Sequence, residues 1–158
     1  NIYNNHSVKY FLPCLINNDF QLLAVWAHKN NSPNFGYIGQ VWKYLETNID
    51  LFNNILIAGD FNSNVIWDEW DRWWNHSDVI NKLKQKNIIC LYHKMTDEVQ
   101  GLESEKTFFL QRNKEKSYHI DYFFGSTEFQ EPNSLTIGKY IDWIGISDHM
   151  PLILELKD

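Results

Sequence analysis

The sequence has few cysteines and no cluster of metal-binding side chains. Its two cysteines, Cys14 and Cys90, lie in apolar, strand-like runs, where a buried free thiol is the common role. No CxxC motif, HxxxH motif or cysteine/histidine cluster is present, which argues against a structural zinc site. So few cysteines favour a reducing compartment, and we therefore expect a cytoplasmic protein.

Long apolar runs and an excess of positive charge are also missing. No apolar run approaches the ~18 residues that a membrane-spanning helix needs, and no secretory signal is recognisable, so we expect no membrane span. The formal net charge of −6 argues against a protein that binds nucleic acid mainly by neutralising phosphates. It leaves open a protein whose carboxylates hold divalent metal ions, which in turn contact phosphate.

The residues that are present suffice for one folded domain. A chain of 158 residues, of which 44% are hydrophobic, can bury one core and is too short for two comfortable domains. The first residue is Asn1 and not Met, which indicates that Asn1 is a processing boundary or an artificial boundary, and not the natural start of the protein. We therefore expect residues 1–158 to form a single domain.

Hydrophobic periodicity predicts an α/β fold with more strand than helix. Two strands between Ser7 and Ala27 flank a turn at Asn17–Asp19, and the run ILIAG at 55–59 has the composition of a strand buried on both faces. Between them, apolar residues recur at helical spacing and predict a helix from about Tyr37 to Phe52. This strand–helix–strand order is typical of neighbouring strands in a parallel or mixed sheet.

The second half of the chain is predicted to be mainly strands. A short helix is expected from Ser77 or Asp78, either of which is a plausible N-cap, to about Asn87. Alternating or apolar runs predict five further strands, at IICLYH (88–93), TFFLQ (107–111), SYHIDYFFGS (117–126), SLTIGKY (134–140) and MPLILEL (150–156).

Polar side chains stand where several of these strands end. Asp60 and Asn62 follow ILIAG two positions apart, so in extended geometry their side chains point the same way. Such residues also end strands for purely structural reasons, because they hydrogen-bond nearby backbone. A carboxylate inside an apolar strand, as Asp121 is, must be paired or ligated. The other polar groups at strand ends are His28 after LLAVWA, and Asp148 and His149 before the last strand.

Three of these segments together resemble a known superfamily. GDFN (59–62), HIDYFF (119–124) and SDHMPL (147–152) are similar, in this order, to the C-terminal motifs of the endonuclease/exonuclease/phosphatase superfamily, which contains exonuclease III and deoxyribonuclease I. The stretch VWAH, which ends at His28, is similar to a strand that ends in histidine in the deoxyribonuclease I branch. The resemblance spans nearly the whole chain and implies the C-terminal portion of a four-layer α/β/β/α sandwich.

The chain departs from the superfamily at its start. Members normally supply a metal-binding Glu from an N-terminal portion that is absent here, and no Glu precedes Glu46 in this sequence. We therefore expect residues 1–158 to be an incomplete domain that retains one sheet and part of the other.

The resemblance implies a divalent-metal-dependent phosphodiester hydrolase that acts on nucleic acid, most simply a DNA endonuclease or exonuclease, with Mg²⁺ or Mn²⁺. Asp60 would position or deprotonate the attacking water and help to bind the metal ion, and Asp148 would contribute a second metal ligand. Asn62 and His149 would contact the phosphate, and Asp121 would accept a hydrogen bond from the other ring nitrogen of His149. His28 would stand near the leaving group as an acid or a phosphate donor.

Other functions stay open at this point. The superfamily also contains inositol-lipid phosphatases and sphingomyelinases, so a phosphatase or phospholipase on the same fold is one alternative, and a non-catalytic fragment is another. Because the upstream Glu is one of few metal ligands, we expect this fragment by itself to hydrolyse phosphodiesters poorly or not at all. A sheet built to be covered on both faces also predicts an exposed apolar patch or self-association here.

A segment rich in tryptophan follows Asn62 and has two interpretations. The structural one, which we favour, is a satellite hydrophobic cluster under a long loop. The functional one is a set of stacking surfaces for bases or for another planar substrate. The residues concerned are Trp67, Trp70, Trp73 and Trp74.

Overall fold

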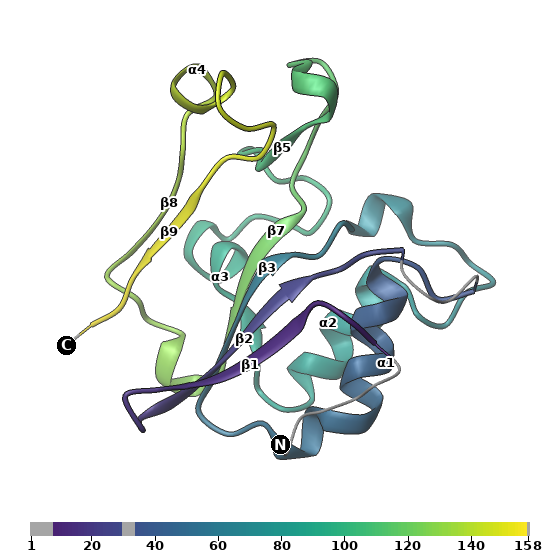
Figure 1. The fold of residues 1–158 in the computed structure, drawn as a ribbon, viewed down its shortest axis with the longest axis vertical. Helices are drawn as coiled ribbons and strands as arrows, with labels where there is room; N and C mark the ends of the chain where they lie inside the picture. Colours follow the sequence, from purple (N-terminus) through teal and green to yellow (C-terminus); the bar gives the residue numbers. More distant parts are fainter. Residues whose placement is uncertain (1–7, 30–33, 158) are drawn as a thin grey trace.

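A five-stranded mixed sheet forms the centre of the protein (Figure 1). The computed structural model describes residues 8–29 and 34–157, so Ser7 of the predicted hairpin lies outside the described residues. Strands β2 and β3 are parallel, as their strand–helix–strand order predicts, and the other pairs in this sheet are antiparallel. The order across the sheet is β1 (Phe11–Ile16), β2 (Phe20–Trp26), β3 (Ile55–Asp60), β7 (Asp121–Gly125) and β4 (Ile89–Cys90).

Two helices cover one face of this sheet (Figure 1). Helix α1 (Ile38–Asn48) continues into the 3₁₀ turn η1 (Ile49–Leu51), close to the predicted helix, and α2 (His76–Lys84) packs against α1. Apolar side chains of both helices meet the inner face of β2 and β3 in the main hydrophobic core, which includes Leu23, Val25, Ile57, Val41, Leu45, Val79 and Leu83. Burying such side chains is the main term that stabilises the packing of the helices on the sheet.

A two-stranded antiparallel ribbon, β8 (Ser134–Ile137) with β9 (Leu152–Glu155), lies on the opposite side of the sheet (Figure 1). A second, smaller core joins it to the sheet: Leu56 of β3 is buried with Leu91 and Phe129, and Leu135 and Leu154 of the ribbon pack against them. The described residues therefore form helix, sheet and ribbon layers. That these layers are one sheet and part of another, as predicted for an incomplete domain, stays a prediction.

The remaining elements are short and lie in the connections. Strands β5 and β6 form a separate small hairpin. The connecting elements are η2 (Val65–Trp67), α3 (Leu91–Thr96), β5 (Phe108–Phe109), η3 (Leu110–Arg112), β6 (Ser117–Tyr118), η4 (Thr127–Phe129) and α4 (Tyr140–Trp143).

Several predicted strands are only partly strands. TFFLQ is a strand only at β5 before η3, and SYHIDYFFGS is divided into β6 and β7, which belong to different sheets. In IICLYH, β4 pairs with β7 only at Ile89 and Cys90, and the chain then turns into α3, whose Leu91 and Tyr92 are buried. A short apolar run has the same composition in a buried helical turn and in a strand, so periodicity could not separate them. In SLTIGKY, β8 ends at Ile137 because Pro151 packs against Gly138, where a Cβ would lie 2.6 Å from the proline Cδ.

Helix α2 begins two residues earlier than the sequence predicts. The N-cap is Asn75, and Asp78 occupies the third helical position of a capping box. The Asp78 carboxylate accepts a hydrogen bond from the Asn75 N–H at 2.8 Å. Asp78 therefore stabilises the start of the helix from inside the first turn, where its negative charge also interacts favourably with the positive end of the helix dipole.

The His76 side chain is fully buried at the start of α2, against the Tyr122 ring at 5.2 Å between centroids. Neither ring nitrogen has a hydrogen-bond partner among the described residues. Burial lowers the pKa of His76 from 6.5 to about 4, although the nearby carboxylates of Asp68 and Glu103 oppose this shift. His76 is therefore neutral in the folded protein at neutral pH.

We expect this histidine to make the protein less stable in mild acid. Between pH 6.5 and 4 the unfolded chain binds a proton at His76 and the folded chain does not, so the free energy of unfolding falls by about 3 kcal/mol across this window. Urea unfolding at several pH values should show this fall, and it should be smaller in His76→Leu, which has no proton to bind. If the free energy of unfolding fell equally with decreasing pH in the two proteins, His76 would not be the buried neutral group responsible for the fall.

Candidate active site

Asp60 lies at the end of the central strand β3, held by backbone bonds on both sides. The Asp60 carbonyl accepts from the Ala27 N–H at 2.7 Å, just beyond β2, and the next residue donates its N–H to Ile120 O at 2.9 Å, just before β7. Gly59 makes this close approach possible: it has φ +143°, and a Cβ there would lie 1.9 Å from Val25 O. Only glycine fits this strand position without moving β2.

Three of the predicted site residues converge at this strand end. Asp60 and Asp121 face each other across β3 and β7, and each of Asp60, Asp121 and His149 offers a ligand atom within 4.8 Å of the others. The predicted contact between Asp121 and His149 is present, with His149 Nδ1 3.0 Å from Asp121 Oδ2. Two carboxylates and an imidazole thus share one small volume.

The electrostatics of this cluster follow from crowding two carboxylates. Burial, together with the neighbouring charge of Asp121, raises the pKa of Asp60 from 3.8 to about 6. The hydrogen bond to Asp121 raises the pKa of His149 above its ordinary value. A pair of like charges directly opposite on adjacent strands is unfavourable unless a proton or a cation lies between them.

The ring of His149 is fixed from several sides. Its residue forms an isolated antiparallel bridge with Phe108, and the two rings lie 4.6 Å apart between centroids. The backbone N–H of His149 donates to Ser147 Oγ at 3.0 Å. Thr107, next to Phe108, has no exposed surface and accepts from the Asp121 N–H at 3.1 Å, so one buried threonine holds the backbone of β7 beside the imidazole.

Asn62 contacts the cluster, but its amide group is already engaged. Its Nδ2 atom donates to Asp60 Oδ2 at 2.6 Å and to Ala27 O at 3.0 Å, and its backbone N–H donates to Asp60 Oδ1 at 2.7 Å. Its φ of +45° lies in the left-handed region that Asn tolerates better than most residues. Asn62 therefore both ends the strand and orients the Asp60 carboxylate.

The two other predicted site residues lie outside this group of ligand atoms. The His28 ring contacts Trp26 and Tyr10, with centroids 5.0 Å and 5.6 Å away. Asp148 precedes His149 in the chain and is not one of the three residues whose ligand atoms converge in the described part of the protein. The roles of His28 near the leaving group and of Asp148 as a metal ligand stay predictions.

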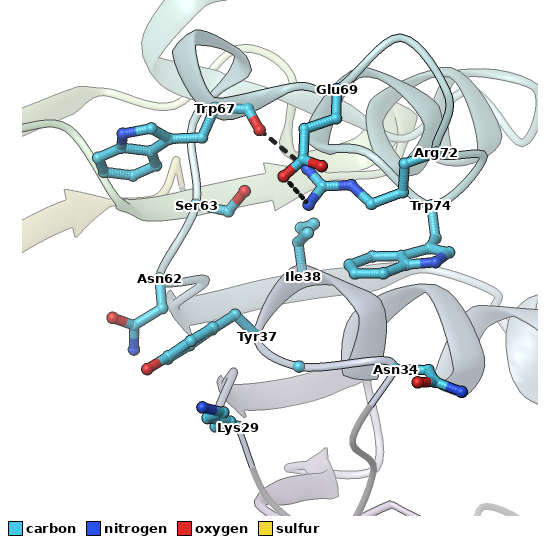
Figure 2. Close-up of a pocket in the computed structure, with 11 residues that line it drawn as sticks. Lys29, Asn34, Tyr37, Ile38, Asn62, Ser63, Trp67, Glu69, Arg72 and Trp74 are labelled. Atoms are coloured by element: carbon cyan, nitrogen blue, oxygen red, sulfur yellow. Dashed lines mark hydrogen bonds and ion pairs between the residues drawn. The ribbon is translucent and has the colours of Figure 1, made fainter.

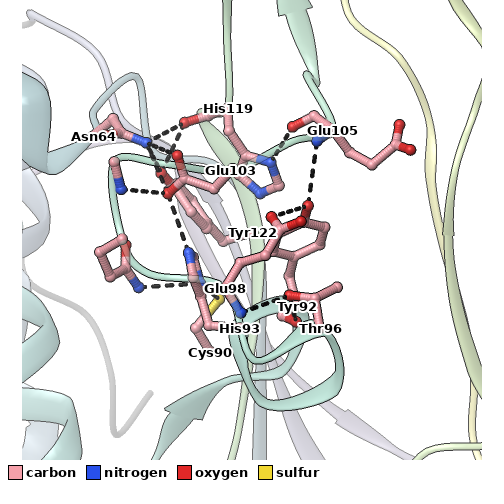
Figure 3. A network of polar contacts seen from close by, with 12 residues as sticks. Asn64, Cys90, Tyr92, His93, Thr96, Glu98, Glu103, Glu105, His119 and Tyr122 are labelled. Atoms are coloured by element: carbon pink, nitrogen blue, oxygen red, sulfur yellow. Dashed lines mark hydrogen bonds and ion pairs between the residues drawn. The ribbon is translucent and has the colours of Figure 1, made fainter.

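A buried polar network behind the cluster was not predicted from the sequence (Figure 3). The Asn64 Nδ2 atom lies 3.1 Å from the Glu103 carboxylate and 3.0 Å from His119 O, and the Tyr122 hydroxyl donates to Ser63 O at 3.1 Å. These bonds tie the turn after β3 to β7. The sequence gave no role to Glu103 or Asn64, because their partners lie far away along the chain.

The same network contains a buried ion pair (Figure 3). His93 Nε2 lies 3.1 Å from Glu103 Oε1, and His93 Nδ1 lies 3.0 Å from Cys90 Sγ. Burial opposes the charge on both side chains, but hydrogen bonds raise the pKa of His93 to about 9 and lower that of Glu103 to about 2. Glu103 is thus a charged acceptor that fixes Asn64, and through it the loop that carries Asn62.

Solved structures with the same fold identify the architecture. No protein-family model and no curated protein matches the sequence. A variant of the 3' phosphatase NExo from Neisseria, bound to a product DNA hairpin, is similar with a TM-score of 0.68 and 13% identity over 94% of this chain. An AP endonuclease from Archaeoglobus fulgidus (TM-score 0.63, 16% identity, 94%) and one from Leishmania major (TM-score 0.59, 10% identity, 89%) are also similar.

The chain thus shares its fold with these phosphatase and AP endonuclease structures, which confirms the predicted α/β class and the fold that the three motifs imply. It spans 65% of the Neisseria and Archaeoglobus structures and 51% of the Leishmania one. Within the described residues, no helix is both long and apolar enough to pass through a bilayer.

Proposed function

We propose that this chain is part of a divalent-metal-dependent phosphodiester hydrolase that acts on nucleic acid. The observation that supports this most directly is the convergence of Asp60, Asp121 and His149 at the end of β3, on a fold whose neighbours include a 3' phosphatase and AP endonucleases. The motifs that contain these three residues are recognisable in the sequence by themselves. Fold alone would be compatible with many functions, so the proposal depends on these side chains.

The donor set fits a hard divalent cation. Asp60 is the carboxylate best placed to hold Mg²⁺ or Mn²⁺, and the facing Asp121 carboxylate adds negative charge at the same point. Such an ion would neutralise charge on the non-bridging phosphate oxygens. Asp148 and a Glu from outside residues 1–158 complete the proposed ligand set.

The other residues of the cluster have roles that do not depend on the ion. Asp121 accepts from Nδ1 of His149 and thereby fixes the ring so that Nε2 faces the substrate. Nε2 would donate to a phosphate oxygen and stabilise the charge that develops there. Asp60 would orient the attacking water and accept its proton, and Asn62 holds the Asp60 carboxylate in place.

We also propose that residues 1–158 belong to a single larger domain. The chain covers 65% of the Neisseria phosphatase structure, and its described residues place the two-stranded ribbon β8–β9 on the second side of the five-stranded sheet. Large apolar side chains are exposed, among them Leu12 at 62%, Leu15 at 59% and Ile153 at 53%. Further strands of the same protein, or a second copy in the predicted self-association, would cover them.

The proposal predicts metal-dependent cleavage of nucleic acid. Supercoiled plasmid, single-stranded DNA, RNA, an inositol phosphate and sphingomyelin should be assayed with Mg²⁺ or Mn²⁺, using this chain and a version extended by the sequence upstream of Asn1. We expect EDTA-sensitive cleavage of DNA by the extended protein and little by this chain alone. Hydrolysis of only the inositol phosphate or sphingomyelin would favour the phosphatase or phospholipase alternative, and EDTA-resistant activity would contradict a metal requirement.

Metal binding can be tested without any activity. Calorimetric titration of Mn²⁺ should show an affinity that falls at least about tenfold in Asp60→Asn, because one charged ligand becomes neutral at nearly constant shape. Glu46→Gln is the matched control. It removes the same charge from helix α1, where Glu46 pairs with Lys82, and should leave the affinity unchanged. Equal losses in the two variants would contradict the assignment of Asp60 as a ligand.

A further inference from the structure

A pocket of about 430 Å³ adjoins the cluster of Asp60, Asp121 and His149 at Asn62, and Figure 2 shows the residues that line it. Asn62 joins the two, because its side chain lines the pocket while its amide donates to Asp60. Ser63 continues the lining on the same side, and Trp74 and Arg72 lie across the pocket from them (Figure 2). The wall between these two sides includes Tyr37, Ile38 and Trp67. A volume of this size accepts one small organic group such as a nucleoside.

The wall on the side of the tryptophan-rich segment is held rigidly. The Arg72 guanidinium lies 4.4 Å over the Trp74 ring and donates to Asn75 Oδ1 at 2.8 Å, to Glu69 Oε1 at 3.1 Å and to Trp67 O at 2.9 Å. Trp67 in turn packs against Tyr118, three residues before Asp121, with ring centroids 4.9 Å apart. These contacts join the aromatic wall to the segment that leads into β7 and Asp121.

Two aromatic rings on this pocket remain accessible. Tyr37 is 45% exposed and Trp67 is 43% exposed, although both are large rings that folding normally covers. Tyr37 has φ +52° and ψ −116°, a backbone conformation that is costly for a bulky residue. Strain and apolar exposure next to a reactive cluster are typical of a binding surface. The sequence favoured a purely structural role for the tryptophan-rich segment. That role fits Trp74, which packs on the main core.

The lining chemistry decides what the pocket can hold. Arg72 already donates to three acceptors, and one of them is the Glu69 carboxylate, whose negative charge offsets that of the guanidinium. The remaining lining combines the aromatic faces of Tyr37 and Trp67 with polar groups, which suits a flat ring with a polar edge. The polar groups are those of Lys29, Asn34, Asn62 and Ser63, besides the Glu69 carboxylate that pairs with Arg72. Every nucleobase is such a ring. A bilayer surface would be met by protruding side chains, whereas this site is concave.

We propose that this pocket holds one unstacked base of single-stranded nucleic acid, adjacent to the phosphate bound at Asp60, Asp121 and His149. This inference rests on the proposed function, which identifies the neighbouring group as a phosphate of nucleic acid. It adds that the substrate is single-stranded. The enzyme would select strands in which a base is free to leave the stack, because a paired base cannot enter a pocket beside the backbone without being extruded.

Binding in EDTA, where cleavage is blocked, tests the pocket separately from catalysis. A fluorescein-labelled single-stranded DNA is titrated by anisotropy against the protein, Trp67→Ala and Trp70→Ala. Trp70 is the matched control, since it lies in the same segment, is 97% exposed and does not line the pocket. We expect about tenfold weaker binding for Trp67→Ala, the usual loss when one stacked base is released, and a change below twofold for Trp70→Ala.

A scan with abasic nucleotides, one position at a time, tests whether a base is the group in contact. At one position, an abasic nucleotide should weaken binding to the unmodified protein about tenfold. At the same position it should weaken binding to Trp67→Ala less than twofold, because that variant has already lost the contact. Additive losses in the two proteins would overturn the proposal. Tyr37→Leu provides a second variant should Trp67→Ala fail to fold, as judged by its thermal melting curve, and the same non-additivity is expected of it.

Two further measurements separate the outcomes. If the protein extended by the sequence upstream of Asn1 hydrolyses bis(p-nitrophenyl) phosphate with Mn²⁺ but the abasic scan is additive, the pocket assignment fails while the proposed function stands. If it hydrolyses no phosphodiester but the scan is non-additive, the proposed function fails and the base-binding pocket stands. Binding to phosphatidylserine vesicles that is lost in Trp67→Ala, with unchanged binding of DNA, would overturn the base in favour of a lipid surface.

Discussion

Replacing Asp60 by Asn, or His149 by Ala, should lower kcat for DNA cleavage by on the order of a hundredfold or more in the active, extended protein. Asp60→Asn removes the charge that orients the water, and His149→Ala removes the ring that Asp121 holds at 3.0 Å. Because the groups act on one transition state, the double variant should be little worse than either single variant.

The controls for this prediction distinguish chemistry from folding. Glu46→Gln on α1 should change kcat by less than about twofold, because an exposed ion pair contributes little to stability. Single-turnover cleavage of a defined oligonucleotide gives the rates, and thermal melting shows whether each variant is folded. Equal losses at Asp60, His149 and Glu46 would indicate damage to the fold and would remove the support for the site.

Gly59→Ala should lower the free energy of unfolding by more than ~3 kcal/mol. A Cβ at this position would lie 1.9 Å from Val25 O, and φ +143° is unfavourable for any other residue. The added atom would push β3 away from β2 and displace Asp60, so metal binding should be lost together with stability.

Gly145→Ala provides the comparison for this substitution. No atom lies within 4 Å of a Cβ built at Gly145, so this change should alter the free energy of unfolding by less than about 0.5 kcal/mol. Urea unfolding of the two variants measures the difference. A folded, stable Gly59→Ala protein with unchanged Mn²⁺ affinity would show that β2 and β3 do not approach as closely as described.

The order of elements and the main helix were predictable because they depend on local patterns. The apolar spacing of Ile38, Val41 and Leu45 places one face of α1 on the sheet, and the unbroken apolar run before Gly59 marks a strand buried on both sides. Strand lengths were less predictable. β4 stops at Cys90 because the chain turns into α3 at Leu91, although β7 continues to Asp121, and the apolar composition of this run does not mark that change.

Part of the candidate site was also predictable. Asp60, Asn62, Asp121 and His149 were singled out from strand-end positions and from the resemblance of three motifs, and the structure brings all four into contact. Residues that act through distant partners could not be predicted from the sequence. Glu103 lies in a stretch with the composition of a turn, yet it is buried and bonded to Asn64, 39 positions earlier.

By itself, the sequence determined the α/β class, the order of strand, helix and strand, and which carboxylates and imidazole are candidates for the site. These features are local, since side-chain periodicity and strand-end chemistry are properties of a few consecutive residues. Only the tertiary structure decided the register that sets Asp60 opposite Asp121, the charge state of Asp60, and the pocket between Tyr37 and Trp74. Each of these depends on distances between segments far apart in the chain, and such distances are fixed by packing of the whole core.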